Sequence, residues 1–455
     1  MSAPTGALTR NRTRDGFGGF VRAARNSGRL VVQPRMGMSD PQVMREGLLA
    51  TRQAAATTVG TITLDSYTRV GAHETARRAL ADGVALNGYP IVAYNTATTG
   101  AVTEGIAGAA FPVQVRHGSA APQDIFEALV AVGLTATEGG PVSYCLPYSR
   151  TPLTQSVANW RRCCEVLAGL RGSGEEPHLE TFGGCMMGQL CPPSLLIAIS
   201  VLEALFFRQH GLRSVSLSYA QQTHPGQDEE AVTALGRIAG ELLAGLDWHI
   251  VIYTYMGVYP RSSGGARLLL DEAARLAVRT GAARLIVKTA AEAHRIPTIA
   301  ENVTALEAAS AAADAERLAP AGTPVQDTGV HAEARTLIDT VLDLDPDIGQ
   351  ALISAFALGL LDVPYCLHPD NAGRTRSYLD SAGRLHWSDT GAMPVRGAAR
   401  SADGRRMTSA DLLTSLSYVE RTYDRRALET APRAHHRPDA LTHRQIIHPS
   451  EEYTR

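Results

Sequence analysis

Lysine is almost absent from this chain of 455 residues: of its 43 basic residues, only Lys288 is a lysine. That lysine does not follow the glycines of a Gly-x-x-x-x-Gly-Lys-Ser/Thr loop, which excludes a phosphate-binding loop of that type. The formal net charge is -2. A chain without an excess of basic residues lacks the electrostatic footprint of a nucleic-acid-binding protein, and we expect no nucleic acid as a partner.

Long apolar runs and paired cysteines are missing as well. The longest apolar run, 195–207, is interrupted by Ser200 and Glu203 and is shorter than the roughly 20 residues that span a bilayer. We therefore expect a buried helix there and no membrane partner. Six cysteines form no Cys-x-x-Cys pair and no signal-peptide pattern precedes them, which predicts reduced thiols in a cytoplasmic protein. Cys185 and Cys191 have no neighbouring histidines, so we expect no metal site.

Strand and helix signals alternate along the chain. Runs rich in β-branched residues predict strands at 30–33, 61–67, 90–94, 113–116, 134–138, 179–182, 214–219, 249–255 and 284–288. Periodic stretches predict helices between them, including 41–56, 123–132, 195–210, 229–246 and 266–279. This alternation is typical of a parallel sheet covered by helices, and we predict an α/β fold, a TIM-type (β/α)8 barrel. Nine predicted strands exceed the eight of that barrel, so one is misassigned or lies outside the ring.

The predicted barrel occupies residues 30–320. Residues 1–29 are rich in Arg, Gly and Ser without periodicity, and we interpret them as a loose N-terminal arm. Residues 321–455 are predicted to form an α-rich, partly irregular extension, with helices near 331–361 and an irregular polar tail from Pro364 onward.

The densest cluster of candidate site residues follows two neighbouring predicted strands. One strand ends at Arg116, with His117 next to it, and the following strand ends at Glu138. The carboxyl ends of successive parallel strands meet on one side of a barrel, so both charged side chains should face one cavity. Tyr144 and Tyr148 lie on the next turn and could complete the hydrogen bonding. One cationic and one anionic wall suit a small zwitterion.

Two more arginines lie at or just beyond the ends of predicted strands, Arg35 in QPRMG and Arg69 in DSYTR. Asp65 could pair with Arg69, which would make that arginine structural. A buried cation without a partner is costly, and the nearby sequence offers few carboxylates beyond Asp65 and Glu138. Guanidinium groups hold carboxylates by bidentate contacts. The pattern therefore favours a ligand with two carboxylates and one amine.

The lone lysine, Lys288, ends the predicted strand RLIVK. It could be an accident of composition, or a compact ammonium could be needed where a planar guanidinium does not fit. A desolvated lysine with a lowered pKa could also form a Schiff base, so a lyase or aldolase acting on an acidic amino acid stays open. A barrel that binds such an amino acid without turning it over is a further alternative, although Glu138 and the tyrosines speak against it.

The segment Asp247-Trp248-His249 begins like the Asp-x-His-x-x-Gly signature by which some proteins bind cobalamin through histidine. Ile252 occupies the glycine position of that signature. We therefore interpret the segment as the start of a strand.

A series of motifs runs from about residue 31 to about residue 390: QPRMG, DSYTR, LNGYP, QVRHG, EGGPVSY, PPS, IVKT followed by EA and IPT, and NAG at 371–373. In order and spacing this series resembles the large, catalytic subunit of glutamate mutase (methylaspartate mutase, epsilon chain). The resemblance implies interconversion of L-glutamate and (2S,3S)-3-methylaspartate by a radical mechanism with adenosylcobalamin. It also implies a small cobalamin-binding partner subunit, in a heterotetramer of two large and two small subunits.

The resemblance also implies roles for individual residues. Glu138 matches the catalytic carboxylate that binds the substrate amine. Substrate contacts fall on Arg35, Arg69, Arg116, His117, Glu138, Tyr144 and Tyr148. Cofactor contacts fall on Gly37, Asn87, Pro147, Tyr259, Lys288, Glu292 and Ile296. The sequence departs from the family pattern in a shorter N-terminal arm, in Pro141, which replaces a glycine beside Tyr144, and in a tail that diverges after about residue 390.

Overall fold

The structure is a computed structural model that describes residues 16–187, 190–320, 325–395 and 408–430. In these residues, eight parallel strands form one sheet in the order β1-β8-β7-β6-β5-β4-β3-β2. A bridge between Val32 and Thr58 joins the two ends of this order, so the sheet is almost closed into a barrel. The strands are β1 (Val31–Pro34), β2 (Gly60–Thr63), β3 (Val113–Arg116), β4 (Ala136–Glu138), β5 (His178–Glu180), β6 (Ser214–Ala220), β7 (Asp247–Tyr253) and β8 (Arg284–Val287).

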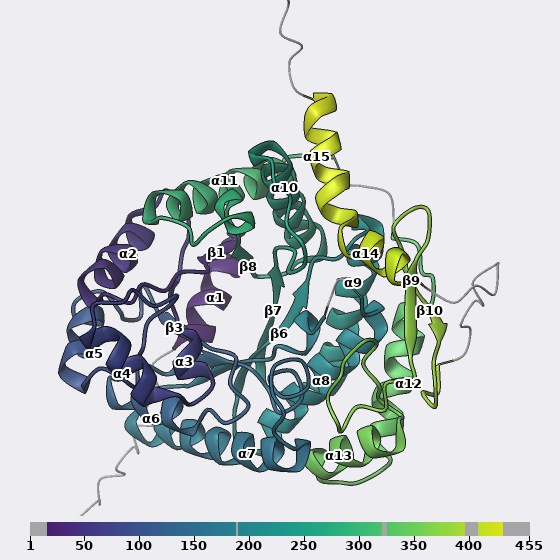
Figure 1. The fold of residues 1–455 in the computed structure, drawn as a ribbon, viewed down its shortest axis with the longest axis horizontal. Coiled ribbons are helices and arrows are strands. Elements are labelled where there is room, and N and C mark those ends of the chain that lie inside the picture. The colour runs from purple at the N-terminus through teal and green to yellow at the C-terminus, as the bar shows by residue number, and fades with distance from the viewer. Residues whose placement is uncertain (1–15, 188–189, 321–324, 396–407, 431–455) are drawn as a thin grey trace, which may run out of the picture.

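Helices surround the barrel, as Figure 1 shows. Within the described ranges one main helix follows each strand: α2 (Pro41–Gln53), α5 (Thr96–Thr103), α6 (Gln123–Ala131), α7 (Leu153–Gly169), α8 (Pro193–Gln209), α9 (Pro225–Leu242), α10 (Ser263–Thr280) and α11 (Ile299–Arg317). Two short helices precede α5, namely α3 (Ser66–Arg69) and α4 (His73–Ala81). Strands covered by helices outside and filled by side chains inside are buried on both faces. The parallel order and the ring of helices confirm the predicted (β/α)8 barrel.

The prediction of a strand at 90–94 is wrong. Ala93 donates its backbone N–H to the Pro90 carbonyl over 2.9 Å, which makes this segment a turn. Strand-like pairing is limited to one bridge between Tyr89 and Leu64. The run is apolar because it packs into the core, and a short apolar run does not by itself distinguish a strand from a buried turn.

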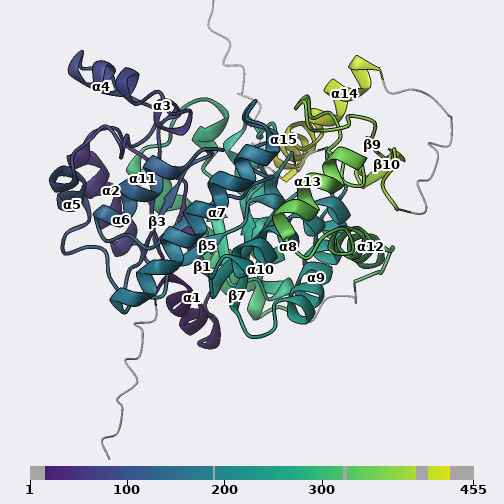
Figure 2. The same cartoon turned by 90° about the horizontal axis from the view of Figure 1, so that it is seen from below.

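The N-terminal segment closes the amino-terminal end of the barrel. Helix α1 (Phe17–Asn26) lies at that end, opposite α3 and α4, as Figure 2 shows. The Phe17 ring stacks on His178 at 5.0 Å between centroids, and the Arg284 guanidinium lies 4.9 Å from the same ring. The prediction of a loose arm is therefore wrong for this helix. Its buried side is narrow and consists of Phe17, Gly18, Val21 and Ala24, whereas its arginines are exposed. Residues 1–15 of the predicted arm lie outside the described residues.

The C-terminal part packs on one flank of the barrel. Its elements are α12 (Val330–Leu342), α13 (Ile348–Leu358), β9 (Arg376–Leu379), β10 (Leu385–Asp389), α14 (Ser409–Leu416) and α15 (Tyr418–Thr430). α12 and α13 pack against α8, and α15 packs against α10. The helices predicted near 331–361 are confirmed. The prediction of an irregular tail is wrong for the antiparallel β9–β10 hairpin and for α14 and α15, whereas the domain boundary near residue 320 stays a prediction.

The apolar run 195–207 lies in α8 and is buried throughout, as predicted. All six cysteines are free and buried. None of the helices in the described ranges has both the length and the apolar character that a membrane crossing requires.

A fully buried ion pair crosses the barrel interior. Arg284 on β8 and Glu180 on β5 are both 0% exposed, and Nη2 of Arg284 contacts Oε2 of Glu180. The same guanidinium donates to Gln33 Oε1 and, over 3.0 Å, to Ser216 Oγ. Charges taken out of water are tolerated when they are paired and hydrogen-bonded in this way. Removal of one partner would leave the other charge buried and unpaired.

Replacement of Arg284 by Met should therefore destabilise the protein by about 3–5 kcal/mol. Arg267→Met is the matched control, because Arg267 pairs with Asp271 on α10 but is 53% exposed, and such surface pairs contribute about 0–1 kcal/mol. The measurement is urea unfolding of both variants followed by circular dichroism. Equal unfolding midpoints for the two variants would contradict the importance of the interior pair.

Candidate active site

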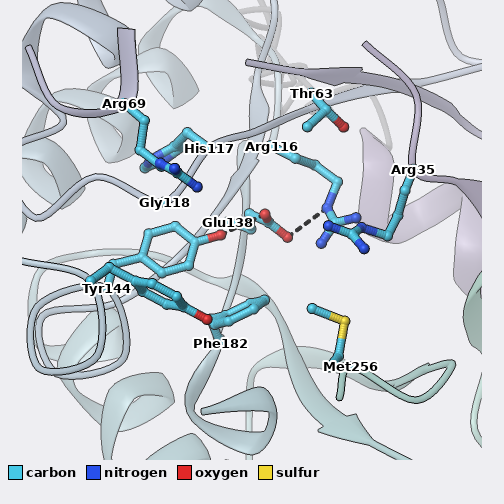
Figure 3. A pocket seen from close by; sticks show the side chains of 11 residues that line it. Arg35, Thr63, Arg69, Arg116, His117, Gly118, Glu138, Tyr144, Phe182 and Met256 are labelled. Carbon is cyan, nitrogen blue, oxygen red and sulfur yellow. Dashed lines mark hydrogen bonds and ion pairs between the residues drawn. The ribbon is translucent and has the colours of Figure 1, made fainter. Parts of the chain in front are cut away.

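A cavity of about 170 Å³ lies at the carboxyl ends of the barrel strands. Arg116 and Glu138 are the last residues of β3 and β4, and Arg35 directly follows β1. The lining residues, shown in Figure 3, are Arg35, Thr63, Arg69, Arg116, His117, Gly118, Glu138, Tyr144, Tyr148, Phe182 and Met256. All seven residues predicted to contact substrate thus lie around one cavity.

Arg116 and Glu138 form a buried ion pair at this cavity. Arg116 Nε donates to Glu138 Oε2 over 2.8 Å, and the two side chains are 5% and 2% exposed. The guanidinium also lies 4.9 Å from the centre of the Tyr253 ring. Its Nη1 is buried but has no hydrogen-bond partner among the described residues. A buried donor without an acceptor is costly, and a carboxylate bound in the cavity would supply the acceptor.

Two tyrosines contact the carboxylate of Glu138. Tyr144 O–H donates to Oε1 over 2.5 Å, and the Tyr253 hydroxyl lies 2.7 Å from Oε2. The Tyr253 hydroxyl also contacts Oε1 of Glu180, which belongs to the interior pair with Arg284. A phenol carries one hydrogen and donates to one carboxylate at a time. The two carboxyl groups therefore compete for this donor or share an extra proton, and the site is coupled to the barrel interior.

His117 is a neutral hydrogen-bonding group beside Arg116. Burial lowers the pKa of His117 to about 3, and the Arg116 charge acts in the same direction. Its Nδ1 accepts the Ser119 backbone N–H over 3.1 Å, so the hydrogen of the neutral ring resides on Nε2. The ring stacks on Trp160 at 5.9 Å between centroids. His117 therefore lines the cavity as a neutral ring.

Arg69 reaches the cavity from α3. Asp65 caps this helix, because its Oδ1 accepts the backbone N–H groups of Tyr67 and Thr68 over 2.8 and 3.1 Å. The carboxylate thus serves the helix backbone, and the Asp65–Arg69 pair considered from the sequence is not what holds it. Arg69 lies across Gly118, where a Cβ atom would be 2.7 Å from Arg69 Cδ. A residue larger than glycine after Arg116-His117 would therefore push the Arg69 side chain away from its place over the end of β3.

A second charged cluster, the Lys288 cluster, lies beyond Arg35. Glu292 Oε2 accepts from Arg35 Nη1 over 2.9 Å and lies 3.5 Å from Lys288 Nζ. Lys288 Nζ donates to the Tyr255 carbonyl over 3.2 Å and lies 4.3 Å from the centre of the Tyr259 ring. Burial lowers the pKa of Lys288 to about 8. Arg35 belongs to both groups and so joins the Lys288 cluster to the cavity.

The structure brings together three of the seven residues predicted to contact the cofactor, Tyr259, Lys288 and Glu292. The other four are on separate loops. Gly37 follows β1, and Asn87 holds the start of α3 by accepting the Ser66 backbone N–H over 2.9 Å. Pro147 lies in the turn after β4, and Ile296 lies beyond β8 and is 54% exposed. Among the described residues no hydrogen bond links these four to the Lys288 cluster.

Six residues at or directly behind the cavity were not predicted from the sequence: Thr63, Gly118, Glu180, Phe182, Tyr253 and Met256. Thr63, Glu180 and Tyr253 are the last residues of β2, β5 and β7. Their positions at the carboxyl ends of barrel strands are the signal that could have identified them. Glu180 carries a second signal, since a carboxylate within a buried strand requires a partner.

The segment Asp247-Trp248-His249 lies at the amino end of β7, at the opposite end of the barrel from the cavity. His249 is buried, and its ring stacks on His178 at 5.2 Å between centroids. The interpretation of this segment as the start of a strand is confirmed. It does not present a histidine at the cavity.

Residues 13–411 match the family model described as "Methylaspartate mutase E chain (MutE)". The glutamate mutase epsilon subunit of Escherichia coli O157:H7 is 29% identical to this chain over 388 residues, which cover 82% of this chain and 79% of the relative. The glutamate mutase epsilon subunit of Halobacterium salinarum is 29% identical over 387 residues, which cover 83% and 80%. That of Yersinia enterocolitica is 29% identical over 379 residues, which cover 80% and 78%. The family match extends over the whole barrel and on into α14, and the chain therefore belongs to the methylaspartate mutase E chain family, whose members are isomerases.

Proposed function

We propose that this chain is the catalytic subunit of an adenosylcobalamin-dependent glutamate mutase that interconverts L-glutamate and (2S,3S)-3-methylaspartate. The observation that carries the proposal is the Arg116–Glu138 pair, which places a buried cation and a buried anion side by side at one cavity. Arg35 and Arg69 line the same cavity. Three guanidinium groups and one carboxylate complement a substrate with two carboxylates and one ammonium. The names of the relatives support the same substrate.

In this proposal, different residues of the cavity bind the negative and the positive groups of the substrate. The three arginines bind the two carboxylates, and Arg116 Nη1, which has no partner among the described residues, donates to one of them. Glu138 binds the ammonium and can accept a proton from it. Tyr144 and Tyr253 hold the two oxygens of Glu138 in place. Tyr148 stands at the rim, 46% exposed, where it can add a hydrogen bond.

The donors and acceptors of the Lys288 cluster fit the adenosyl group of adenosylcobalamin. The hydroxyls of Tyr259 and Thr289 are buried without hydrogen-bond partners in the described part of the chain. Lys288 and Glu292 add a charged donor and a charged acceptor, and ribose hydroxyls and adenine nitrogens require groups of both kinds. When bound, this cofactor supplies the carbon radical that takes a hydrogen atom from the substrate. Further contacts from the loops are proposed for Gly37, Asn87, Pro147 and Ile296.

In this proposal the protein keeps the radical species inside the cavity and holds the substrate fragments in position. Radical species react with water or side chains in an open site, and a cavity set in a packed barrel limits both. The arginines hold the fragments of the carbon skeleton so that their recombination stays within the site. Glu138 keeps the migrating fragment oriented by binding the ammonium of that fragment.

A partner subunit is part of the proposal. The Asp247-Trp248-His249 segment lies at the far end of the barrel and has Ile252 in place of the signature glycine. We propose that a small cobalamin-binding subunit holds the corrin, in a heterotetramer of two large and two small subunits. A cytoplasmic location also stays a prediction.

The Schiff-base alternative has one observation in its favour, the pKa of about 8 that burial produces at Lys288. Two observations favour the mutase. Lys288 Nζ is engaged with the Tyr255 carbonyl and Glu292, and Lys288 is not among the described residues that line the cavity with Glu138.

The purified chain should form 3-methylaspartate from ¹³C-labelled L-glutamate when it is mixed anaerobically with adenosylcobalamin and a small cobalamin-binding mutase subunit. Without the small subunit turnover should be lost, because the cavity presents no histidine of the cobalamin signature. The product is measured by NMR. No product with the partner, or equal turnover without it, would count against the proposal.

Lys288→Arg should lower turnover about a hundredfold, because a planar fork above the Tyr259 ring would displace the bound adenosyl group, and misplacement by about 1 Å can cost that much. The melting temperature should change by only a few degrees, while the apparent affinity for adenosylcobalamin, followed by its visible spectrum, should weaken. Arg161→Lys is the control, since Arg161 is 60% exposed and pairs with Glu165 on α7. Wild-type kinetics in Lys288→Arg would remove the lysine from the cofactor site.

A further inference from the structure

Glu203 is a buried carboxylate that the proposed chemistry does not use. It lies in α8, where it interrupts the apolar run 195–207, and it is 0% exposed. A carboxylate at such a position is costly unless it is fully hydrogen-bonded. The groups that satisfy it therefore indicate what it does.

Five donors from two loops converge on Glu203. Its Oε1 accepts the backbone N–H groups of Val142 over 3.2 Å and Ser143 over 2.9 Å, both in the turn after β4. Its Oε2 accepts the backbone N–H groups of Phe182 over 3.3 Å and Gly183 over 3.0 Å, both after β5. The Ser143 hydroxyl also donates to Oε2, over 3.0 Å. One carboxylate therefore ties two adjacent loops together.

The two loops carry side chains of the proposed substrate site. Tyr144 follows Ser143 and donates to Glu138, and Phe182 lines the cavity. The rings of Tyr144 and Phe182 lie 4.9 Å apart between centroids. A displacement of either loop would therefore move a wall of the cavity.

The turn after β4 is built around Glu203. A Cβ atom at Gly140 would lie 2.0 Å from Glu203 Oε1, so only glycine leaves room for the carboxylate. The next residue, Pro141, accepts a hydrogen bond from Ser156 Oγ on α7 over 2.7 Å. The proline that departs from the family pattern thus lies in a turn that is held from two helices.

We infer that Glu203 is a positioning residue, whose carboxylate couples the turn after β4 to the loop after β5 and so sets the places of Tyr144 and Phe182. What the cavity binds rests on the proposed function, whereas the coupling of the loops does not. Burial raises the pKa of Glu203 to about 7, and the hydrogen bonds from Ser143, Val142 and Phe182 act in the opposite direction. The five hydrogen bonds favour the anion, whereas burial, the larger effect on the pKa, favours the neutral acid.

Glu203→Gln tests this coupling. The amide keeps the shape but has one acceptor oxygen, so one of the two loops must face an NH2 group. Amide hydrogen exchange should become about tenfold faster either at Val142 and Ser143 or at Phe182 and Gly183, the effect of about one lost charge-assisted hydrogen bond. The KM for L-glutamate should rise about tenfold, with a smaller change in kcat.

Asp228→Asn is the matched control. Asp228 is equally buried and accepts from the Gln222 backbone N–H over 3.0 Å and from Tyr219 O–H over 2.9 Å, away from the two loops. It should change stability but neither the exchange of the four amides nor KM. Ser143→Ala removes a single donor and should fold, with a rise in KM of about threefold, typical of one neutral hydrogen bond. If Glu203→Gln does not fold, the Ser143→Ala variant tests instead whether the contacts of Glu203 position the two loops.

Unchanged exchange at the four amides in Glu203→Gln would overturn the inference, and so would faster exchange with an unchanged KM. If the wild-type protein shows no mutase turnover, the proposed function fails. The exchange comparison between Glu203→Gln and Asp228→Asn would still decide whether Glu203 holds the two loops.

Discussion

The ion pair between Arg116 and Glu138 is the interaction on which the rest of the site depends. Two buried charges are stable only when they are close and well hydrogen-bonded, and here Nε and Oε2 are 2.8 Å apart. Glu138 also accepts from Tyr144 on its other oxygen. The arginine side is less complete, since Nη1 lacks a partner among the described residues. In the proposed function, a carboxylate of the substrate would accept from Nη1 and complete the hydrogen bonding of Arg116.

The barrel supports this pair from two directions. Behind it, Tyr253 joins Glu138 to Glu180 and hence to Arg284, so the charges of the site and of the interior share one hydrogen-bonded network. Beside it, Glu203 on α8 ties together the loops that carry Tyr144 and Phe182. Groups that must stay within a fraction of an ångström are better supported by strands and second-layer hydrogen bonds than by loops alone. The fold therefore fixes the positions of the side chains at the cavity and also encloses the cavity.

The barrel and the cavity could be predicted because strand and helix signals alternate and because Arg116 and Glu138 stand at strand ends, where β3 and β4 are parallel neighbours. The ion pair between Arg116 and Glu138 could not be predicted, because the directions of their side chains depend on tertiary packing. The contribution of Tyr253 was missed because β7 is distant from β4 in sequence and does not pair with it, and Tyr253 reaches Glu138 only across the interior of the barrel. The turn at 90–94 was mistaken for a strand because burial, not pairing, makes it apolar.

In the proposed site, Glu138 binds the ammonium of the substrate and Arg116 binds one of its carboxylates. Calorimetric titration with L-glutamate and with glutarate, which lacks the amine, tests this assignment most directly. The wild-type protein should bind L-glutamate at least about tenfold more tightly than glutarate, the effect of one hydrogen bond between charged groups. Glu138→Gln should abolish this preference, and Arg116→Lys should weaken both ligands alike. A preference that survives in Glu138→Gln would contradict the account.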